Sequence, residues 1–251
     1  MFPNARTLLV SPQEVRQRVS NMQGRHPTVS FSSMTTADAL LFFAHQGKQV
    51  CGLNFANGSR AGGGYTTGAS AQEEDLCRRA PNLFPSLLEA QKAGLYPYGP
   101  AANDASKYAN VLFTSSVVIA RESEDRGFEQ LPSDYRATVS LVSAAAPNIR
   151  FAKEIVDERG LDVAVRSIFL VPLSHHLGVS VLVLGAWGCG AFGGDPRFMA
   201  SLFARHLVSG GLGGMYEEVH FAVPSFSTES STNAETFRKV LHENGIQVHN
   251  I

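Results

Sequence analysis

Two adjacent glutamates, Glu73 and Glu74, close a segment that reads GGGYTTGASAQEE from Gly62 onward. A carboxyl group can donate or accept a proton during hydrolysis, and apolar surroundings raise its pKa toward the range where it does both. The three consecutive glycines have no Cβ atoms, so their backbone N–H groups can approach a ligand closely. The combination indicates a ligand site with an acid or base beside it.

Glu73 also has a purely structural interpretation. Ser70 and Glu73 have the S-x-x-E spacing of a capping box, in which Ser70 caps a helix and Glu73 binds the Ser70 amide. Residues next to each other on a helix project about 100° apart, so Glu74 cannot share that role. Glu74 is therefore the candidate general acid or base.

A second glycine-rich segment, GAWGCGAFGGDPRF from Gly185 to Phe198, repeats this organisation. An apolar run precedes it, and Asp195 and Pro196 suit the N-cap and first position of a following helix. A strand, a glycine-rich turn and a capped helix together predict a phosphate site. The segment has neither the G-K-[ST] of a P-loop nor the spacing of a dinucleotide fingerprint, which disfavours ATP hydrolysis and Rossmann chemistry.

Three side chains in this second loop have alternative interpretations. Trp187 and Phe192 either pack on a sugar or base or anchor the loop to the core. Cys189 lies between glycines without an evident base, which argues against a nucleophile.

Elements that could position these loops alternate along the chain. Continuous apolar runs predict strands that are covered on both faces, and the segments between them fit helices, which together predict an α/β sandwich. The predicted strands are Val50 to Phe55, Val111 to Ile119, Val139 to Ala145, Val179 to Gly185 and Val219 to Val223. The predicted helices are Thr36 to His45, Glu73 to Gln91, Phe151 to Arg159, a helix kinked by Pro172 from Leu161 to His176, Pro196 to Val208 and Ala234 to Glu243.

Composition limits the possible partners. With 21 basic and 22 acidic side chains in 251 residues, the net charge gives no reason to expect nucleic-acid binding. Three widely spaced cysteines and an N-terminus without a signal pattern predict an intracellular protein, in the cytoplasm or nucleus. The longest uncharged stretch is interrupted by Pro172 and several glycines, so no membrane span is expected.

We expect a monomer with a single domain over residues 1–251, in which residues 1–45 form a mainly helical extension packed on the rest.

The two loops together resemble a known family. The pattern GGG-x7-QEE at Gly62 to Glu74, preceded by N-F-A-N at 54 to 57, resembles the signature of the poly(ADP-ribose) glycohydrolase family. The loop from Gly185 to Asp195 resembles that family's diphosphate-binding loop. The likeness covers roughly residues 45 to 225, and the lack of a large additional helical region resembles the compact, microbial-type branch. It implies a macrodomain-like fold, a three-layer α/β/α sandwich with a mixed central sheet.

The resemblance also implies roles for individual residues. Glu74 would be the catalytic acid/base, Glu73 would hold a ribose hydroxyl, and Asn57 would contact the distal ribose. The glycine loops would surround the ribose and diphosphate, and Phe226 is a candidate for stacking on adenine. The implied substrate-binding residues are Asn57, Gly62, Gly63, Gly64, Gln72, Gly188, Cys189, Gly190, Ala191 and Phe192.

The implied reaction is hydrolysis of a ribose–ribose O-glycosidic bond of poly(ADP-ribose), from the chain end, with ADP-ribose as product. Glycosidases generally use two opposed carboxylates, but two neighbouring glutamates offer only one side. The residues therefore favour a single acid/base, with no metal and no cofactor. Polymer or ADP-ribosylated proteins would be the partners, without a membrane or a specific nucleic-acid sequence. Two alternatives are a non-catalytic ADP-ribose reader and a mono-ADP-ribosyl hydrolase.

Overall fold

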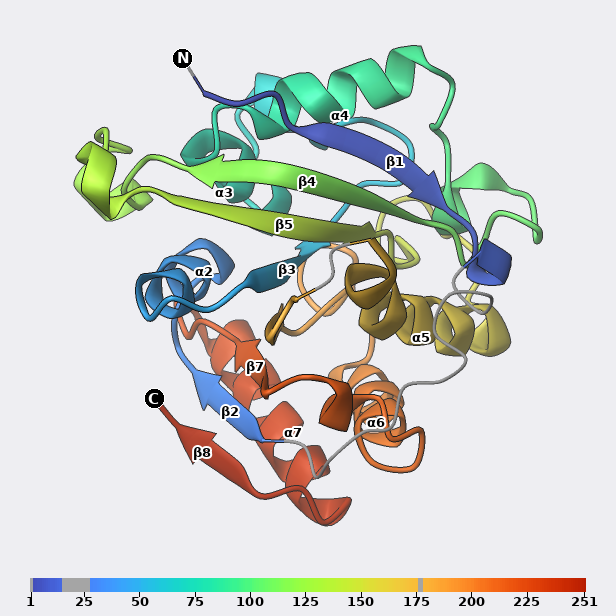
Figure 1. Cartoon of the computed structure of the whole chain (residues 1–251). Helices are drawn as coiled ribbons and strands as arrows, with labels where there is room; N and C mark the ends of the chain where they lie inside the picture. The colour runs from blue at the N-terminus through green and yellow to red at the C-terminus, as the bar shows by residue number, and fades with distance from the viewer. Residues whose placement is uncertain (1, 15–27, 176–177) are drawn as a thin grey trace.

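The computed structural model describes residues 2–14, 28–175 and 178–251, and its centre is a mixed β-sheet (Figure 1). Across the sheet, the eight strands of the described residues are β1 (Arg6–Val10), β4 (Val111–Ile119), β5 (Ala137–Ala144), β3 (Val50–Phe55), β6 (Val181–Leu184), β7 (Glu218–Ala222), β2 (Val29–Ser32) and β8 (Val248–Asn250). β1 pairs antiparallel with β4, and β4 pairs antiparallel with β5, whereas all other neighbouring strands are parallel.

Helices cover both faces of this sheet, as expected for an α/β/α sandwich (Figure 1). One face packs against α2 (Thr36–His45), α3 (Gln72–Arg79) and α4 (Leu83–Lys92), and the other against α5 (Glu158–His175), α6 (Pro196–Leu207) and α7 (Thr228–Glu243). In β6, the side chains of Val181 and Val183 belong to the core under α2, α3 and α4, while those of Leu182 and Leu184 belong to the core under α5, α6 and α7. This alternation explains why the strands read as continuous apolar runs.

The predicted strands are confirmed, and their direction determines where the loops gather. The parallel strands β3, β5, β6, β7 and β2 have their carboxyl ends at the same edge of the sheet. The first glycine loop follows β3, the second follows β6, and the start of α2 follows β2. Ligands of open α/β sheets bind at this edge.

The N-terminal expectation was wrong. Residues 6–10 and 29–32 are strands β1 and β2 of the central sheet, so the described parts of residues 1–45 supply strands to the sheet and are not an extension packed on it; residues 15–27 lie outside the described residues. β2 lies between β7 and β8 and pairs with both. These strands are too short to show a periodicity that separates them from a helix in the sequence.

Two helix predictions were wrong as well. The expected helix from Glu73 to Gln91 is divided into α3 and α4, because Pro81 forces the preceding Ala80 into an extended conformation, with ψ of 90°. Residues 151–157 are not helical: Lys153 has a left-handed φ of 50°, and the helix begins at Glu158. From there α5 continues through Pro172 to His175; the last predicted residue, His176, lies outside the described residues.

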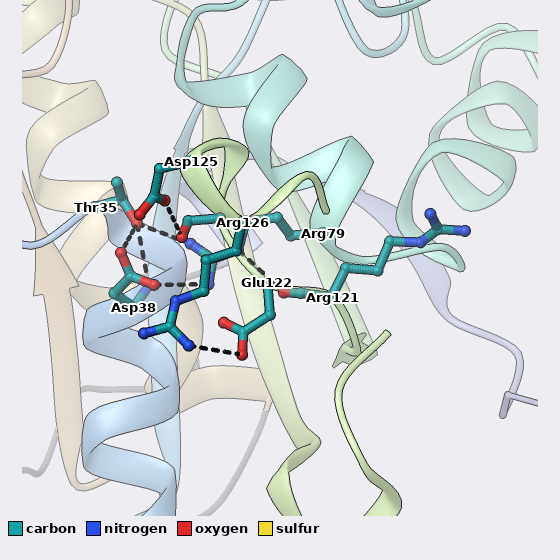
Figure 2. A network of polar contacts seen from close by, with 8 residues as sticks. Thr35, Asp38, Arg79, Arg121, Glu122, Asp125 and Arg126 are labelled. Carbon is teal, nitrogen blue, oxygen red and sulfur yellow. Dashed lines mark hydrogen bonds and ion pairs between the residues drawn. The ribbon is translucent and has the colours of Figure 1, made fainter. Parts of the chain in front are cut away.

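A buried arginine at the end of α3 joins three segments of the chain (Figure 2). Arg79 ends α3 and is fully buried, and its Nη2 atom lies 2.6 Å from Asp38 Oδ1 in the first turn of α2. Nη1 donates to Thr35 Oγ1, the N-cap of α2, and Nε donates to the Arg121 carbonyl just after β4. This ion pair therefore fixes α3 against α2 and the end of β4.

We expect Asp38→Asn to lower the free energy of unfolding by about 2 kcal/mol. The substitution keeps the volume but leaves the Arg79 charge buried without its carboxylate, and the cost stays below that of a fully buried pair because Asp38 is partly exposed. Urea unfolding measures it. As a control, Glu89→Gln removes the exposed Lys92–Glu89 pair and should cost at most about 0.5 kcal/mol. Equal losses in the two variants would contradict the structural role of Arg79.

Candidate active site

The first glycine loop requires glycine for its backbone conformation. Gly62 and Gly63 have φ angles of 66° and 56°, in the left-handed region that side chains disfavour. Tight turns result, in which the Gly63 amide donates to the Arg60 carbonyl and the Tyr65 amide donates to the Gly62 carbonyl. The loop thus folds back toward the start of α3.

Both glutamates bind this loop by its backbone. Glu73 Oε2 accepts from the Asn57 amide at 2.8 Å, and Glu74 Oε1 accepts from the Gly64 amide at 2.8 Å. Gly63 lies between them: a Cβ there would stand 2.5 Å from Glu74 Oε1 and 3.2 Å from Glu73 Oε2. The two carboxyl groups therefore hold the two ends of the loop, and only glycine fits at position 63.

The capping-box expectation was wrong. The N-cap of α3 is Ala71, and no side chain caps this helix end. Ser70 lies one residue earlier and is exposed. With Ala71 at the N-cap, Glu73 and Glu74 occupy the second and third helical positions. The glycine loop wraps around this turn, so both side chains reach it despite their angular separation.

Glu73 is the more enclosed of the two carboxyl groups. Its side chain is only 2% exposed, and Oε1 accepts from Asn54 Nδ2 at 3.1 Å. Burial raises its pKa to about 8, against the opposing effect of the hydrogen bonds from Asn57 and Asn54. Glu73 is therefore mainly protonated at neutral pH, and it acts here as an internal support of the loop.

Glu74 has one oxygen free. The residue is 6% exposed, and while Oε1 is held by Gly64, Oε2 is buried and has no hydrogen-bond partner among the described residues. A buried oxygen without a partner is unfavourable in a resting protein. Its position at the end of the loop suits a carboxyl group that exchanges a proton with a bound substrate.

Gln72 and Asn57 are also held by the protein. Gln72 Oε1 accepts from the Phe55 amide, and its Nε2 donates to the Leu53 carbonyl and to Thr36 Oγ1, so this side chain joins α3 to β3 and α2. Asn57 Oδ1 accepts from the amides of residues 59 and 60, whereas its Nδ2 makes no hydrogen bond to the described part of the chain. Asn57 therefore retains a donor for a ligand.

A cleft of about 1020 Å³ opens at the carboxyl ends of the parallel strands. Five of the expected site residues line it: Gln72, Gly188, Gly190, Ala191 and Phe192. Asn57, Glu73 and Glu74 do not line it themselves, but they are next in the chain to the lining residues Ala56, Gln72 and Asp75. Gly62 to Gly64 do not line it either. Its lining contains a single basic residue, Arg78, beside four acidic ones, Asp38, Asp75, Glu124 and Asp125. An anion bound here must be held chiefly by backbone amides.

The second glycine loop offers such amides. Those of Gly188, Gly190, Ala191 and Phe192 donate no hydrogen bond to the described residues, and all four residues line the cleft. The carbonyl side of the loop is held instead, since Phe192 O accepts from the amides of residues 149 and 150, and Gly188 O accepts from the Gly194 amide. A row of unpaired N–H groups is a characteristic anion-binding arrangement.

Of the two aromatic side chains in this loop, Trp187 anchors it to the core, whereas Phe192 both packs against the core and lines the cleft. Trp187 is fully buried and donates from Nε1 to the Ala144 carbonyl, so it anchors the loop to the core. Phe192 is half-buried and lines the cleft. Cys189 is buried, its pKa is raised to about 12 by that burial, and it lines a smaller cavity of about 300 Å³.

Two relevant residues received no role from the sequence. Asn54 is fully buried and donates to Glu73 Oε1 and to Ser143 Oγ, so it helps to place the glutamate. In the sequence, the signal for this role was the polar side chain of Asn54 near the end of an apolar predicted strand. Arg78, in the cleft, looked like an ordinary basic residue in the last turn of a helix.

The described ranges contain neither a metal-ligand cluster nor a membrane-spanning helix. No three histidine, cysteine, aspartate or glutamate side chains within them are grouped to hold a metal ion. Within the same ranges no helix combines the length and apolar character needed to cross a membrane.

Comparisons with known proteins agree with this geometry. Residues 3–122, which include the first glycine loop and both glutamates, match the family model described as microbial-type PARG, catalytic domain. A crystal structure of poly(ADP-ribose) glycohydrolase (PARG) from Thermomonospora curvata is 28% identical, with a TM-score of 0.78 over 93% of this chain and 85% of that chain. The Deinococcus radiodurans enzyme in complex with ADP-ribose is 28% identical, with a TM-score of 0.78 over 94% of each chain. No curated protein gives a significant sequence match.

The raised pKa of Glu73 predicts a pH-dependent stability. The folded protein keeps this proton up to about pH 8, whereas the unfolded chain releases it near 4.5, so the stabilisation is complete below 4.5 and is lost as the pH rises through 8. Relative to Glu73→Gln, the unfolding free energy of the wild type should fall across this range, as measured by urea unfolding at several pH values. Parallel curves for the two proteins would show that Glu73 is not held protonated.

Proposed function

Because the chain belongs to the family of microbial-type poly(ADP-ribose) glycohydrolases, we propose that Glu74 is the acid/base of its glycosidic hydrolysis and that the cleft holds one ADP-ribose unit. The protein is a glycosidase that acts on poly(ADP-ribose). The observation that supports the role of Glu74 is its arrangement, with Oε1 fixed by the Gly64 amide and Oε2 buried without a partner.

In the proposed reaction Glu74 donates its proton to the departing ribose hydroxyl oxygen as the glycosidic bond breaks. The sugar develops oxocarbenium-like positive charge, which the nearby diphosphate of the substrate stabilises. The Glu74 carboxylate then takes a proton from the water that attacks the anomeric carbon. Glu73 is held by Asn54 and Asn57 and lies on the same side as Glu74, so it does not provide an opposed nucleophile.

The diphosphate would bind the second glycine loop. The unpaired amides of Gly190, Ala191 and Phe192 are successive in the chain and line the cleft, where they can hydrogen bond to phosphate oxygens. We infer that Phe192 then packs on the sugar, and that Asn57 Nδ2 contacts the distal ribose. Recognition through amides explains how a polyanion binds a protein of net charge −1.

The volume of the cleft supports action on a terminal unit. A cleft of about 1020 Å³ is large enough to hold one ADP-ribose unit. All eight described strands belong to one sheet, which supports a single domain. The three cysteines are buried and unpaired, as in proteins of reducing intracellular compartments.

The first test is Glu74→Gln. This variant keeps an oxygen for the Gly64 amide but cannot exchange the proton, so polymer hydrolysis should fall by about 10²–10⁴-fold while ADP-ribose still binds. Release of ADP-ribose from labelled polymer measures turnover, and calorimetry measures binding. Glu89→Gln, an exposed glutamate of α4, is the control and should keep full activity. Undiminished hydrolysis by Glu74→Gln would rule out the proposed role.

The same assay distinguishes the substrate range. We expect the wild type to release ADP-ribose monomers from polymer from the earliest time points, because the terminal unit is the one that fits. Early release of longer oligomers would contradict action at the chain end. Removal of a single protein-linked ADP-ribose without polymer breakdown would contradict the assignment to polymer.

We propose that Phe226, the candidate from the sequence, stacks on the adenine. Its side chain lines the cleft just after β7 and is 79% exposed. Since stacking of an aromatic ring on a base contributes about 1–3 kcal/mol, Phe226→Ala should weaken ADP-ribose binding roughly tenfold by calorimetry. Phe151→Ala, a similarly exposed phenylalanine outside the cleft lining, is the control. Equal affinities of Phe226→Ala and the wild type would exclude this position.

A further inference from the structure

Residues 65–71 form a strap between the glycine loop and α3. The strap begins with the short 3-10 turn η1 (Tyr65–Thr67), and residues 66–71 are all exposed. Hydrogen bonds to the Gly64 carbonyl connect the strap to the glycine loop. The Ala69 amide donates to this carbonyl at 3.1 Å, and the amide and hydroxyl of Thr67 donate to it as well. Tyr65 packs against the core beside Phe84, whereas residues 66–71 are exposed, so the position of the rest of the strap depends on side chains that reach it from outside.

Arg78 is such a side chain. From the last turn of α3, its Nη2 atom donates to the Ala69 carbonyl. Its guanidinium group also lies 5.7 Å from the ring centre of Tyr65 and 6.0 Å from that of Phe128, within cation–π range of both. Arg78 thus connects the strap to α3 and to the loop between β4 and β5, which contains Phe128.

The strap in turn controls the amide that holds Glu74. Gly64 accepts from Ala69 with its carbonyl and donates with its own N–H to Glu74 Oε1 at 2.8 Å. Gly64 and Ala69 are packed so closely that a Cβ on Gly64 would stand 2.6 Å from the Ala69 Cβ. Glu74 and Arg78 are four residues apart and share one face of α3. The same face of α3 therefore carries Glu74 and Arg78, and Arg78 holds the strap that positions the Gly64 amide, the hydrogen-bond donor to Glu74.

We propose that Arg78 is a positioning residue for the hydrolytic reaction: it holds the strap at residues 65–71 so that the Gly64 amide keeps Glu74 Oε1 in place. This rests on the proposed function, because the effect on rate requires Glu74 to be the acid/base. Arg78 acts through the strap and does not touch the reacting atoms.

The surroundings of Arg78 argue against direct contact with the diphosphate. Asp75, Glu124 and Asp125 also line the cleft, and Asp75 interacts electrostatically with Arg78 and Glu124. Burial raises the pKa of Asp75 to about 6, so it is mainly charged at neutral pH. Several carboxylates beside one guanidinium repel a phosphate, and the unpaired amides of the second glycine loop are a better place for it.

The test compares Arg78→Gln with Arg78→Lys and with Arg126→Gln, an exposed arginine outside the cleft lining, as the matched control. Arg78→Gln should lower kcat by roughly 10- to 100-fold, because a small misplacement of an acid/base has effects of this size. ADP-ribose affinity should change less than kcat. Hydrogen exchange should accelerate in residues 63–70, where the Gly64 and Ala69 amides lose protection. Arg78→Lys keeps a cationic donor and should recover part of kcat.

Several outcomes would overturn the inference. A loss of ADP-ribose affinity with unchanged kcat and unchanged exchange would make Arg78 a substrate contact. Wild-type kcat in Arg78→Gln would remove its role altogether. In a Glu74→Gln background, Arg78→Gln should cause no further loss, and an additive loss would show that it does not act through Glu74. If Glu74→Gln itself remains active, the proposed function fails. If Glu74→Gln is inactive and Arg78→Gln is normal, only this inference fails.

Discussion

Two hydrogen bonds from backbone amides to neighbouring carboxyl groups organise this site. Glu73 receives the Asn57 amide and Glu74 receives the Gly64 amide, so one helical turn holds both ends of the glycine loop. Gly63 is enclosed between the two carboxyl groups, where a Cβ would collide with Glu74. The geometry of the loop, the identity of its central residue and the free oxygen of Glu74 all depend on this arrangement.

Most of the surrounding contacts keep α3 in the place that these bonds require. Gln72 joins its first turn to β3 and α2, and Asn54 supports Glu73 from within β3. At the other end of the helix, Arg79 pairs with Asp38 and binds the backbone after β4 (Figure 2). The protonated state of Glu73 fits this picture, since two charged carboxylates side by side in a buried turn would repel each other.

The sequence predicted the parts whose signal is local. Apolar runs located β3, β4, β5, β6 and β7, and the glycine clusters beside QEE and before Asp195 located both loops. The errors share a physical origin in contacts that no local pattern shows. Ser70 has the right spacing for a cap, but Asn57 and Gly64 supply the amides that the glutamates bind. β1 and β2 are short strands that exist because distant partners, β4 and β7, pair with them.

The most direct measurement is a crystal structure of the wild-type protein with ADP-ribose. The account predicts that the anomeric hydroxyl of the distal ribose lies within about 3 Å of Glu74 Oε2, while Oε1 still accepts from the Gly64 amide and the diphosphate lies on the amides of Gly190 to Phe192. A distal ribose beyond hydrogen-bond reach of Glu74, or a diphosphate bound to Arg78 in place of those amides, would contradict it.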